Sequence, residues 1–61
     1  MNGIPQHHPE QFLTVAEAAQ IARLHAQTIR TAIRSGALKA KRAGRMIRIP
    51  RSDFEAWLAD V

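Results

Sequence analysis

Apolar residues recur at helical spacing in two neighbouring stretches of the chain. The first stretch gathers four apolar residues on one face, namely Val15, Ala18, Ala19 and Ala22. Thr14 stands before it and Glu17 follows three residues later, which is the spacing of a capping box at the start of a helix. The second stretch, from about Ala26 to Ser35, gathers Ala26, Ile29, Ala32 and Ile33. Gly36 comes next, and its freedom to adopt a positive φ predicts that the second helix ends there.

The side of the second helix opposite its apolar face carries long polar side chains. At about 100° per residue, that side is shared by Gln27, Arg30, Thr31 and Arg34. Solvation alone would explain such a face, so the helix by itself leaves a solvated surface and a binding surface both open. Two short helices joined by a tight turn predict a helix-turn-helix motif.

From Leu38 to Ile49 the pattern changes from helical spacing to alternation, which is typical of strands. Leu38, Ile47 and Ile49 would face the core, and Ala43-Gly44 between the two strands predicts a tight turn. A two-stranded hairpin is marginally stable alone, so this hairpin is expected to pack against the helices.

The exposed surface of the expected hairpin is cationic. Its basic residues are Lys39, Lys41, Arg42, Arg45 and Arg48. Basic side chains also protect exposed strand edges from pairing, but one or two would suffice for that. Five favour a wing that touches a phosphate backbone or enters a groove of nucleic acid.

A third helical pattern follows Pro50, which is expected to end the second strand. Ser52 and Glu55 have the spacing of a second capping box, so this helix is expected to begin there. Its apolar face is formed by Phe54, Trp57 and Leu58. Trp57 is the largest apolar side chain in the sequence and is expected to anchor the core.

These patterns together predict a mainly helical α+β fold, a small winged helix-turn-helix with three short helices. A two-stranded β-hairpin wing lies between the second and third helices. The chain has 61 residues, which is one domain. Residues 12–61 form this domain, and residues 1–11, with two prolines and a glycine, are expected to be a flexible arm.

Composition narrows the chemistry. The sequence has no cysteine, which excludes disulfides and thiolate metal sites and fits a reducing cytoplasm. His7-His8 lacks a third ligand nearby, so no metal site is expected. There is no glycine-rich phosphate loop and no nucleophile placed beside a base, so neither a cofactor nor an enzyme is expected. No apolar run approaches the length of a membrane span.

Charge is distributed in blocks along the chain. The formal net charge is +4, and all nine Lys and Arg residues lie between Arg23 and Arg51, where there is no acidic residue. The acids near the C-terminus, Asp53, Glu55 and Asp60, come after this block. A basic block inside folded sequence is typical of nucleic-acid binding. Membrane-surface binding is less favoured, because the bases do not lie on one amphipathic helix.

Most of the chain also resembles the excisionase-type, MerR-like winged helix-turn-helix family. The resemblance is carried by four segments: LTVAEAA from Leu13, TI from Thr28, IRSGAL from Ile33 and GRMIRIPRSDFEAWL from Gly44. Two positions depart from the family pattern. Arg23 stands where the family usually turns on glycine, and His25 stands where a Ser or Thr cap is common.

The resemblance implies that the second helix enters the major groove and that the wing lies over the backbone or the minor groove. The helix would then contribute Gln27, Thr28, Arg30, Thr31 and Arg34. The wing would contribute its cations Lys39, Lys41, Arg42, Arg45 and Arg48, and Arg23 would add a phosphate contact.

The implied function is that of an excisionase, a recombination directionality factor in a bacterial cytoplasm. It would bind repeated duplex sites cooperatively, bend the DNA and direct an integrase toward excision. The chain is expected to be a monomer when free, because nothing in it resembles a dimerisation coil, and to contact other copies of itself on DNA. Two alternatives stay open: a small phage or plasmid transcriptional regulator, and a protein-interaction module that does not bind DNA.

Overall fold

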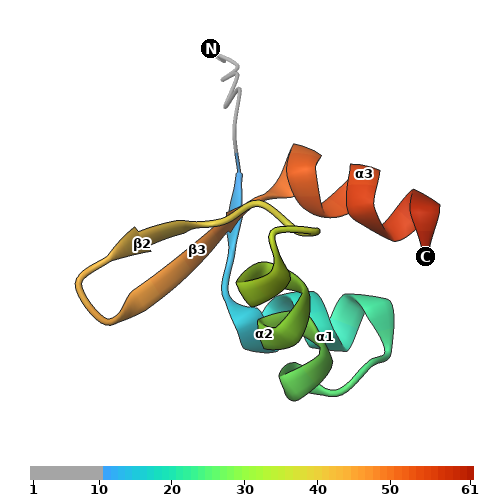
Figure 1. Ribbon diagram of the computed structural model, residues 1–61, viewed down its shortest axis with the longest axis horizontal. Coiled ribbons are helices and arrows are strands. Elements are labelled where there is room, and N and C mark those ends of the chain that lie inside the picture. The colour runs from blue at the N-terminus through green and yellow to red at the C-terminus, as the bar shows by residue number, and fades with distance from the viewer. Residues whose placement is uncertain (1–10) are drawn as a thin grey trace, which may run out of the picture.

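The computed structural model describes residues 11–61, which form three helices and three short strands. In chain order these are β1 (Phe12–Leu13), α1 (Val15–Ala22), α2 (Ala26–Ser35), β2 (Lys41–Ala43), β3 (Met46–Pro50) and α3 (Arg51–Asp60). The β2–β3 hairpin extends away from the helices as a wing (Figure 1). The predicted fold class, a small, mainly helical winged helix-turn-helix, is confirmed. The expected flexible arm, with His7-His8, lies outside the described residues except for Gln11.

The sheet contains a strand that the sequence patterns did not predict. Strand β1 pairs antiparallel with β3, with Leu13 opposite Ile49, so the strand order is β1-β3-β2. Two residues are too few to show alternation, so periodicity could not reveal this strand. It ties the start of the domain to the base of the wing and places Leu13 in the core.

The wing is shorter than expected, and its turn is shifted by one residue. Ala43 pairs with Met46, so Gly44 and Arg45 form the two-residue turn. Gly44 has a φ of +62°, and a positive φ at the first central position is the requirement of a type II′ hairpin turn. The expectation that strand structure begins near Leu38 is wrong. The Leu38 N–H donates to the Ala32 carbonyl at 3.0 Å, so this segment folds back over the end of α2.

Helix α1 begins with the predicted capping box. The Glu17 N–H donates to Thr14 Oγ1 at 3.0 Å, and the Thr14 N–H donates to Glu17 Oε1 at 2.8 Å. These two bonds satisfy backbone donors that an uncapped helix would leave without partners.

The turn after α1 is built on Arg23 in a left-handed conformation, with φ 59° and ψ 42°. The Arg23 N–H donates to the Gln20 carbonyl at 3.3 Å, and the Leu24 N–H donates to the Ala19 carbonyl at 2.9 Å. This pair of bonds is a Schellman motif with Arg23 at the position that glycine usually takes. The missing glycine therefore does not change the course of the turn.

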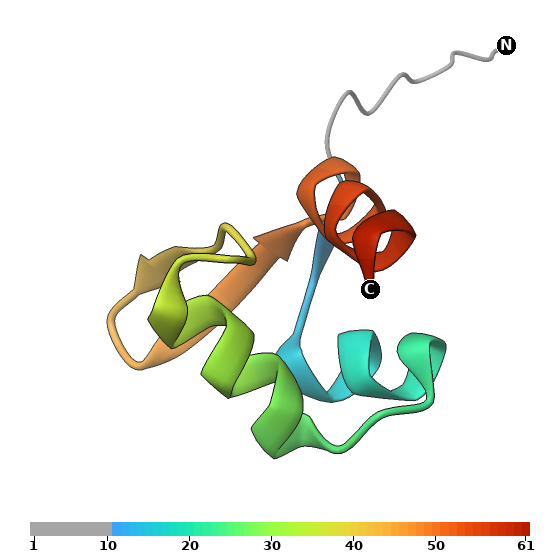
Figure 2. The same ribbon diagram turned by 45° about the vertical axis from the view of Figure 1, so that its right-hand side comes forward.

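Helix α2 has the predicted bounds. It follows His25, which is extended and makes no side-chain capping bond. It ends at Gly36, whose φ of +87° fits its expected role as the left-handed C-terminal residue. Helices α1 and α2 pack against each other and form the helix-turn-helix, best seen in Figure 2.

Helix α3 starts one residue before the predicted capping box, because Pro50 is its N-cap and Arg51 its first residue. The expectation that Ser52 caps this helix is therefore wrong. The Arg51 N–H donates to the Gln11 carbonyl at 2.6 Å, so the residue just before β1 satisfies a donor at the start of the helix. The Glu55 carboxylate accepts a bond from Arg51 Nε at 3.1 Å.

The core is small and is anchored by Phe54. Its buried residues are Leu13, Ala18, Ala19, Ile29, Leu38, Ile49 and Phe54. Phe54 is 0% exposed, whereas Trp57 is only partly buried at the edge of the core. The expectation that Trp57 is the anchor is wrong, because Phe54 occupies the centre and Trp57 leans against it with ring centroids 6.2 Å apart.

Candidate nucleic-acid interface

The polar face of α2 is open to solvent. Ile29 is fully buried and fixes the rotation of the helix, which leaves all the predicted contact residues exposed: Gln27, Thr28, Arg30, Thr31 and Arg34. Gln27 Nε2 donates to Thr31 Oγ1 at 3.5 Å, so these two side chains are held together one turn apart. Thr28 is about 100° around the helix from Gln27 and therefore stands at the flank of this face.

The wing presents its cations on both of its faces. Directly opposed residues of an antiparallel pair share a face, so Lys41 and Arg48 lie on the same side as Ala43 and Met46. Arg42 is paired with Ile47 and lies on the other side. The cations of the hairpin, Lys41, Arg42, Arg45 and Arg48, are all exposed.

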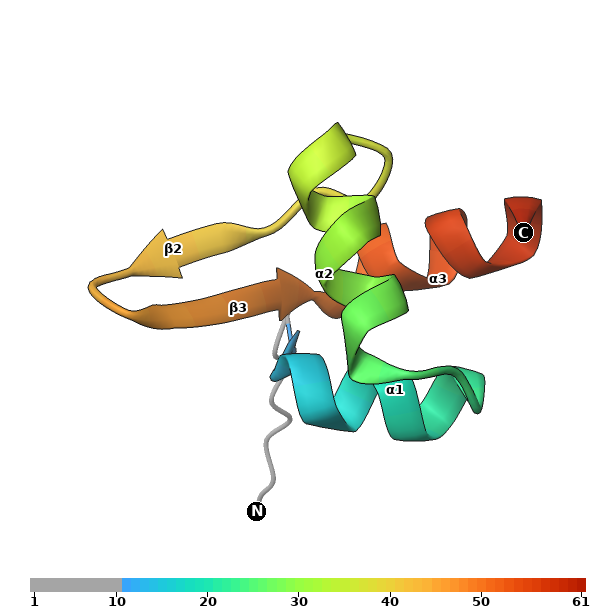
Figure 3. The same cartoon turned by 60° about the horizontal axis from the view of Figure 1, so that its bottom comes forward.

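The structure brings α2 and the wing to the walls of one hollow of about 310 Å³. Arg30 of α2 and Arg45 of the wing turn both line it, and Thr14, at the start of α1, lies at its side. Figure 3 shows α2 and the wing side by side in this orientation. Two elements that are not adjacent in the sequence therefore each contribute an arginine to one surface hollow.

Phe12 is an interface feature that the sequence patterns missed. The Lys41 ammonium lies 5.8 Å from the centroid of the Phe12 ring, a cation–π contact across the sheet. Phe12 is 37% exposed and lies beside the base of the wing. Only the pairing of β1 with β3 creates this contact, and periodicity carried no signal for that pairing.

Almost all the cations in residues 11–61 form no ion pair. Within residues 11–61 the one ion pair joins Arg51 to Glu55, with Nε and Oε2 3.1 Å apart. The basic residues of α2 and the wing, together with Arg23, form no ion pair in this part of the chain. Uncompensated positive charge therefore covers α2 and the wing, which is the arrangement that attracts a polyanion.

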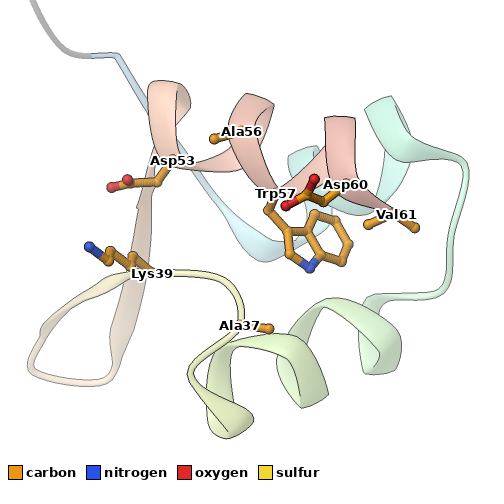
Figure 4. A pocket seen from close by; sticks show the side chains of 7 residues that line it. All are labelled: Ala37, Lys39, Asp53, Ala56, Trp57, Asp60 and Val61. Carbon is orange, nitrogen blue, oxygen red and sulfur yellow. The ribbon is translucent and has the colours of Figure 1, made fainter.

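Lys39 lies apart from the other predicted wing residues. It precedes β2 and lines a groove of about 500 Å³ together with Asp53, Trp57 and Asp60 of α3 (Figure 4). In Figure 4 the indole of Trp57 extends from α3 toward Ala37, across the groove. Asp53 and Asp60 thus border an aromatic surface, and Asp53 also lines a second hollow with Lys41 of the wing. The tip of the wing extends away from the C-terminal end of α3 (Figure 1).

Two further observations concern other chemistries. No group of three or more His, Asp or Glu side chains suitable for a metal ion occurs in the described part of the chain. None of the helices between residues 11 and 61 has both the length and the apolar character needed to cross a membrane.

The three helices, the hairpin after α2 and the exposed polar face of α2 define a winged helix-turn-helix protein. Residues 12–60 match the family model described as a helix-turn-helix domain, and the chain belongs to this family. No curated protein and no solved structure matches the chain. Membership of the family indicates sequence-specific binding to double-stranded DNA.

Proposed function

We propose that this protein is an excisionase, a recombination directionality factor that acts by binding and bending duplex DNA and not by catalysis. It binds repeated sites cooperatively and directs an integrase toward excision in the cytoplasm of a bacterial host. The observation that carries the DNA-binding part is the shared hollow, which Arg30 of α2 and Arg45 of the wing both line, with neither paired to an acid within residues 11–61.

We assign base reading to α2 and positioning to the wing. An exposed α-helix fits the major groove, which is about 12 Å wide. Arg30 and Arg34 then reach guanine edges, Gln27 pairs with adenine, and Thr28 and Thr31 make further contacts. The wing cations and Arg23 contact phosphates, which fixes the register of the protein without reading sequence.

Cooperative binding is supported by the opposite charges of the wing tip and of the C-terminal end of α3. The wing is cationic, whereas α3 carries Asp53 and Asp60 beside the groove of Trp57 (Figure 4). Pairing the wing of one copy with α3 of the next is heterologous and need not close into a dimer. Copies that are monomers when free would then continue along tandem repeats and curve the duplex as they add.

A small phage or plasmid transcriptional regulator is the second candidate, because the same helix-turn-helix surface serves both functions. The groove beside Trp57 favours a third candidate, a protein-interaction module that uses α3 on a partner. A flat salt response in DNA titrations would favour this third candidate over the first two.

The test of the proposal is a recombination assay with the cognate integrase on supercoiled attachment-site DNA. We expect excision to require the protein. Integration should not require it and should not be stimulated by it. Gel-shift and bending assays on tandem, same-direction repeats should show cooperative binding and a bend that grows with each copy. Independent filling of the sites, or one inverted repeat bound by a preformed dimer, would support the transcriptional regulator instead.

A further inference from the structure

The tip of the wing carries an exposed apolar side chain that neither the core nor the proposed phosphate contacts use. Met46 is 53% exposed, more than Phe12, Ile21 or Leu24. It follows the turn directly and lies beside Arg45. Removing this apolar side chain from water would be favourable, and a bound partner could cover it.

We propose that Met46 is an apolar wedge that enters the minor groove of the bound duplex and presses against a base step there. This inference rests on the proposed DNA binding and adds a contact residue to it. The thioether of Met46 carries no hydrogen-bond donor for a phosphate oxygen. Its partners in a duplex are therefore the sugars and bases. Methionine is unbranched, flexible and polarizable, and it is one of the side chains that proteins insert between base steps.

The geometry of the hollow places the wedge at the minor groove. With α2 in the major groove, the next features of the duplex are a sugar–phosphate strand and then the adjacent minor groove. The hollow lies between α2 and the wing, and both Arg30 and Met46 line it. We place that strand along the hollow, with Arg45 on its phosphates and Arg30 directed at the base edges of the major groove. Met46, on the wing side of the hollow, is then the lining residue nearer the minor groove.

The width of the minor groove explains why the tip alone enters. That groove is about 6 Å wide, whereas a two-stranded ribbon needs the major groove. Only side chains at or next to the turn can reach its floor, and with Arg45 on a phosphate Met46 is the long side chain left to do so. A wedge at this point unstacks one base step and kinks the duplex toward the major groove, so each bound copy bends DNA by itself.

The experiment uses a duplex selected from a random library with the wild-type protein. 2-Aminopurine replaces adenine at successive positions, and fluorophores at the two ends report the bend. Met46→Gln keeps the length of the side chain and removes its apolar character, while Met46→Leu keeps the apolar character. Ile21→Gln is the matched control, because Ile21 is 44% exposed on α1, away from the wing.

We expect wild type and Met46→Leu to raise 2-aminopurine fluorescence at one step and to bend the duplex. Met46→Gln should lose that signal and bind roughly three- to ten-fold more weakly. The salt slope of Met46→Gln should stay unchanged, because no charge is altered. Ile21→Gln should behave as wild type, and circular dichroism should show all the variants folded.

An undiminished fluorescence signal and bend in Met46→Gln would overturn the wedge while leaving the DNA-binding proposal intact. Equal losses in Met46→Gln and Ile21→Gln would also overturn it, because they would show a general effect of exposed glutamine. Absence of salt-dependent duplex binding by wild type would be a failure of the proposed function, and the wedge would fall with it.

Discussion

Arg23 offers the sharpest test of the local physics, because it holds a left-handed conformation that costs a non-glycine residue about 1–2 kcal/mol. Its φ of 59° and its Schellman hydrogen bonds fix that conformation. Glycine would remove this cost but would lower stability by roughly 0.4–1 kcal/mol through the greater freedom of the unfolded chain. The midpoints of these two ranges differ by about 0.8 kcal/mol, so we expect Arg23→Gly to raise the free energy of unfolding by about 0.5–1 kcal/mol.

For a domain of this size, such a gain corresponds to a rise in Tm of about 2–8 °C. Arg23→Ala is the control, since it removes the same charge and keeps the left-handed strain. Thermal unfolding followed by circular dichroism measures both variants. A rise in Tm as large in Arg23→Ala as in Arg23→Gly would show that charge repulsion, and not backbone strain, is relieved. An unchanged Tm in Arg23→Gly would refute the strain argument itself.

The same pair of variants tests the proposed phosphate contact of Arg23. Both lose one cation, so both should make the slope of log K against log salt less negative by about 0.9. A slope equal to that of wild type in both variants would remove Arg23 from the DNA interface while leaving the stability prediction untouched.

Three further predictions follow from the core, the interface and the first helix. Phe54→Ala should cost about 3–5 kcal/mol and unfold so small a domain, whereas Trp57→Ala, at a partly buried position, should stay folded with a lower Tm. Thermal unfolding measures both variants, and a larger loss of stability in Trp57→Ala than in Phe54→Ala would show that Trp57 is the anchor of the core. In competition titrations, Arg34→Ala should weaken DNA binding by about 1–3 kcal/mol at the preferred site and relax the sequence preference there, while Arg45→Ala should weaken binding to all sequences alike. If Arg45→Ala changed the sequence preference and Arg34→Ala did not, the two roles would be reversed. Thr14→Ala should lower the free energy of unfolding by roughly 0.5–2 kcal/mol in a denaturant titration, because it removes the N-cap of α1. An unchanged free energy of unfolding would mean that the capping box does not stabilise the fold.

Periodicity predicted the helices well because their signals are local. The capping box of Thr14 and Glu17 and the positive φ of Gly36 are each determined within one turn of chain, and the spacing that puts Ile29 on the apolar face of α2 is local as well. The second capping box failed for a non-local reason. The carbonyl of Gln11, far away in the sequence, already accepts the first N–H of α3, so that helix begins earlier than Ser52.

The candidate site also contains one part that local sequence patterns predict and one part that depends on non-local pairing. The exposed face of α2 follows directly from helical spacing, and its residues lie where the sequence places them. The hollow shared by Arg30 and Arg45, and the contact of Lys41 with Phe12, depend on how β1 and the wing pair. A two-residue strand has no period to detect, so these features needed the structure.

The central claim is that α2 and the wing form one cationic surface for duplex DNA, and salt dependence of binding tests it most directly. Each phosphate contact contributes about −0.9 to the slope of log K against log salt, so contacts from most of these cations predict a slope of roughly −4 to −7. The titration should use fluorescence anisotropy on a labelled duplex, with Arg42→Ala and Arg45→Ala each making the slope less negative by about one contact. A slope near zero for the wild-type protein would contradict the account.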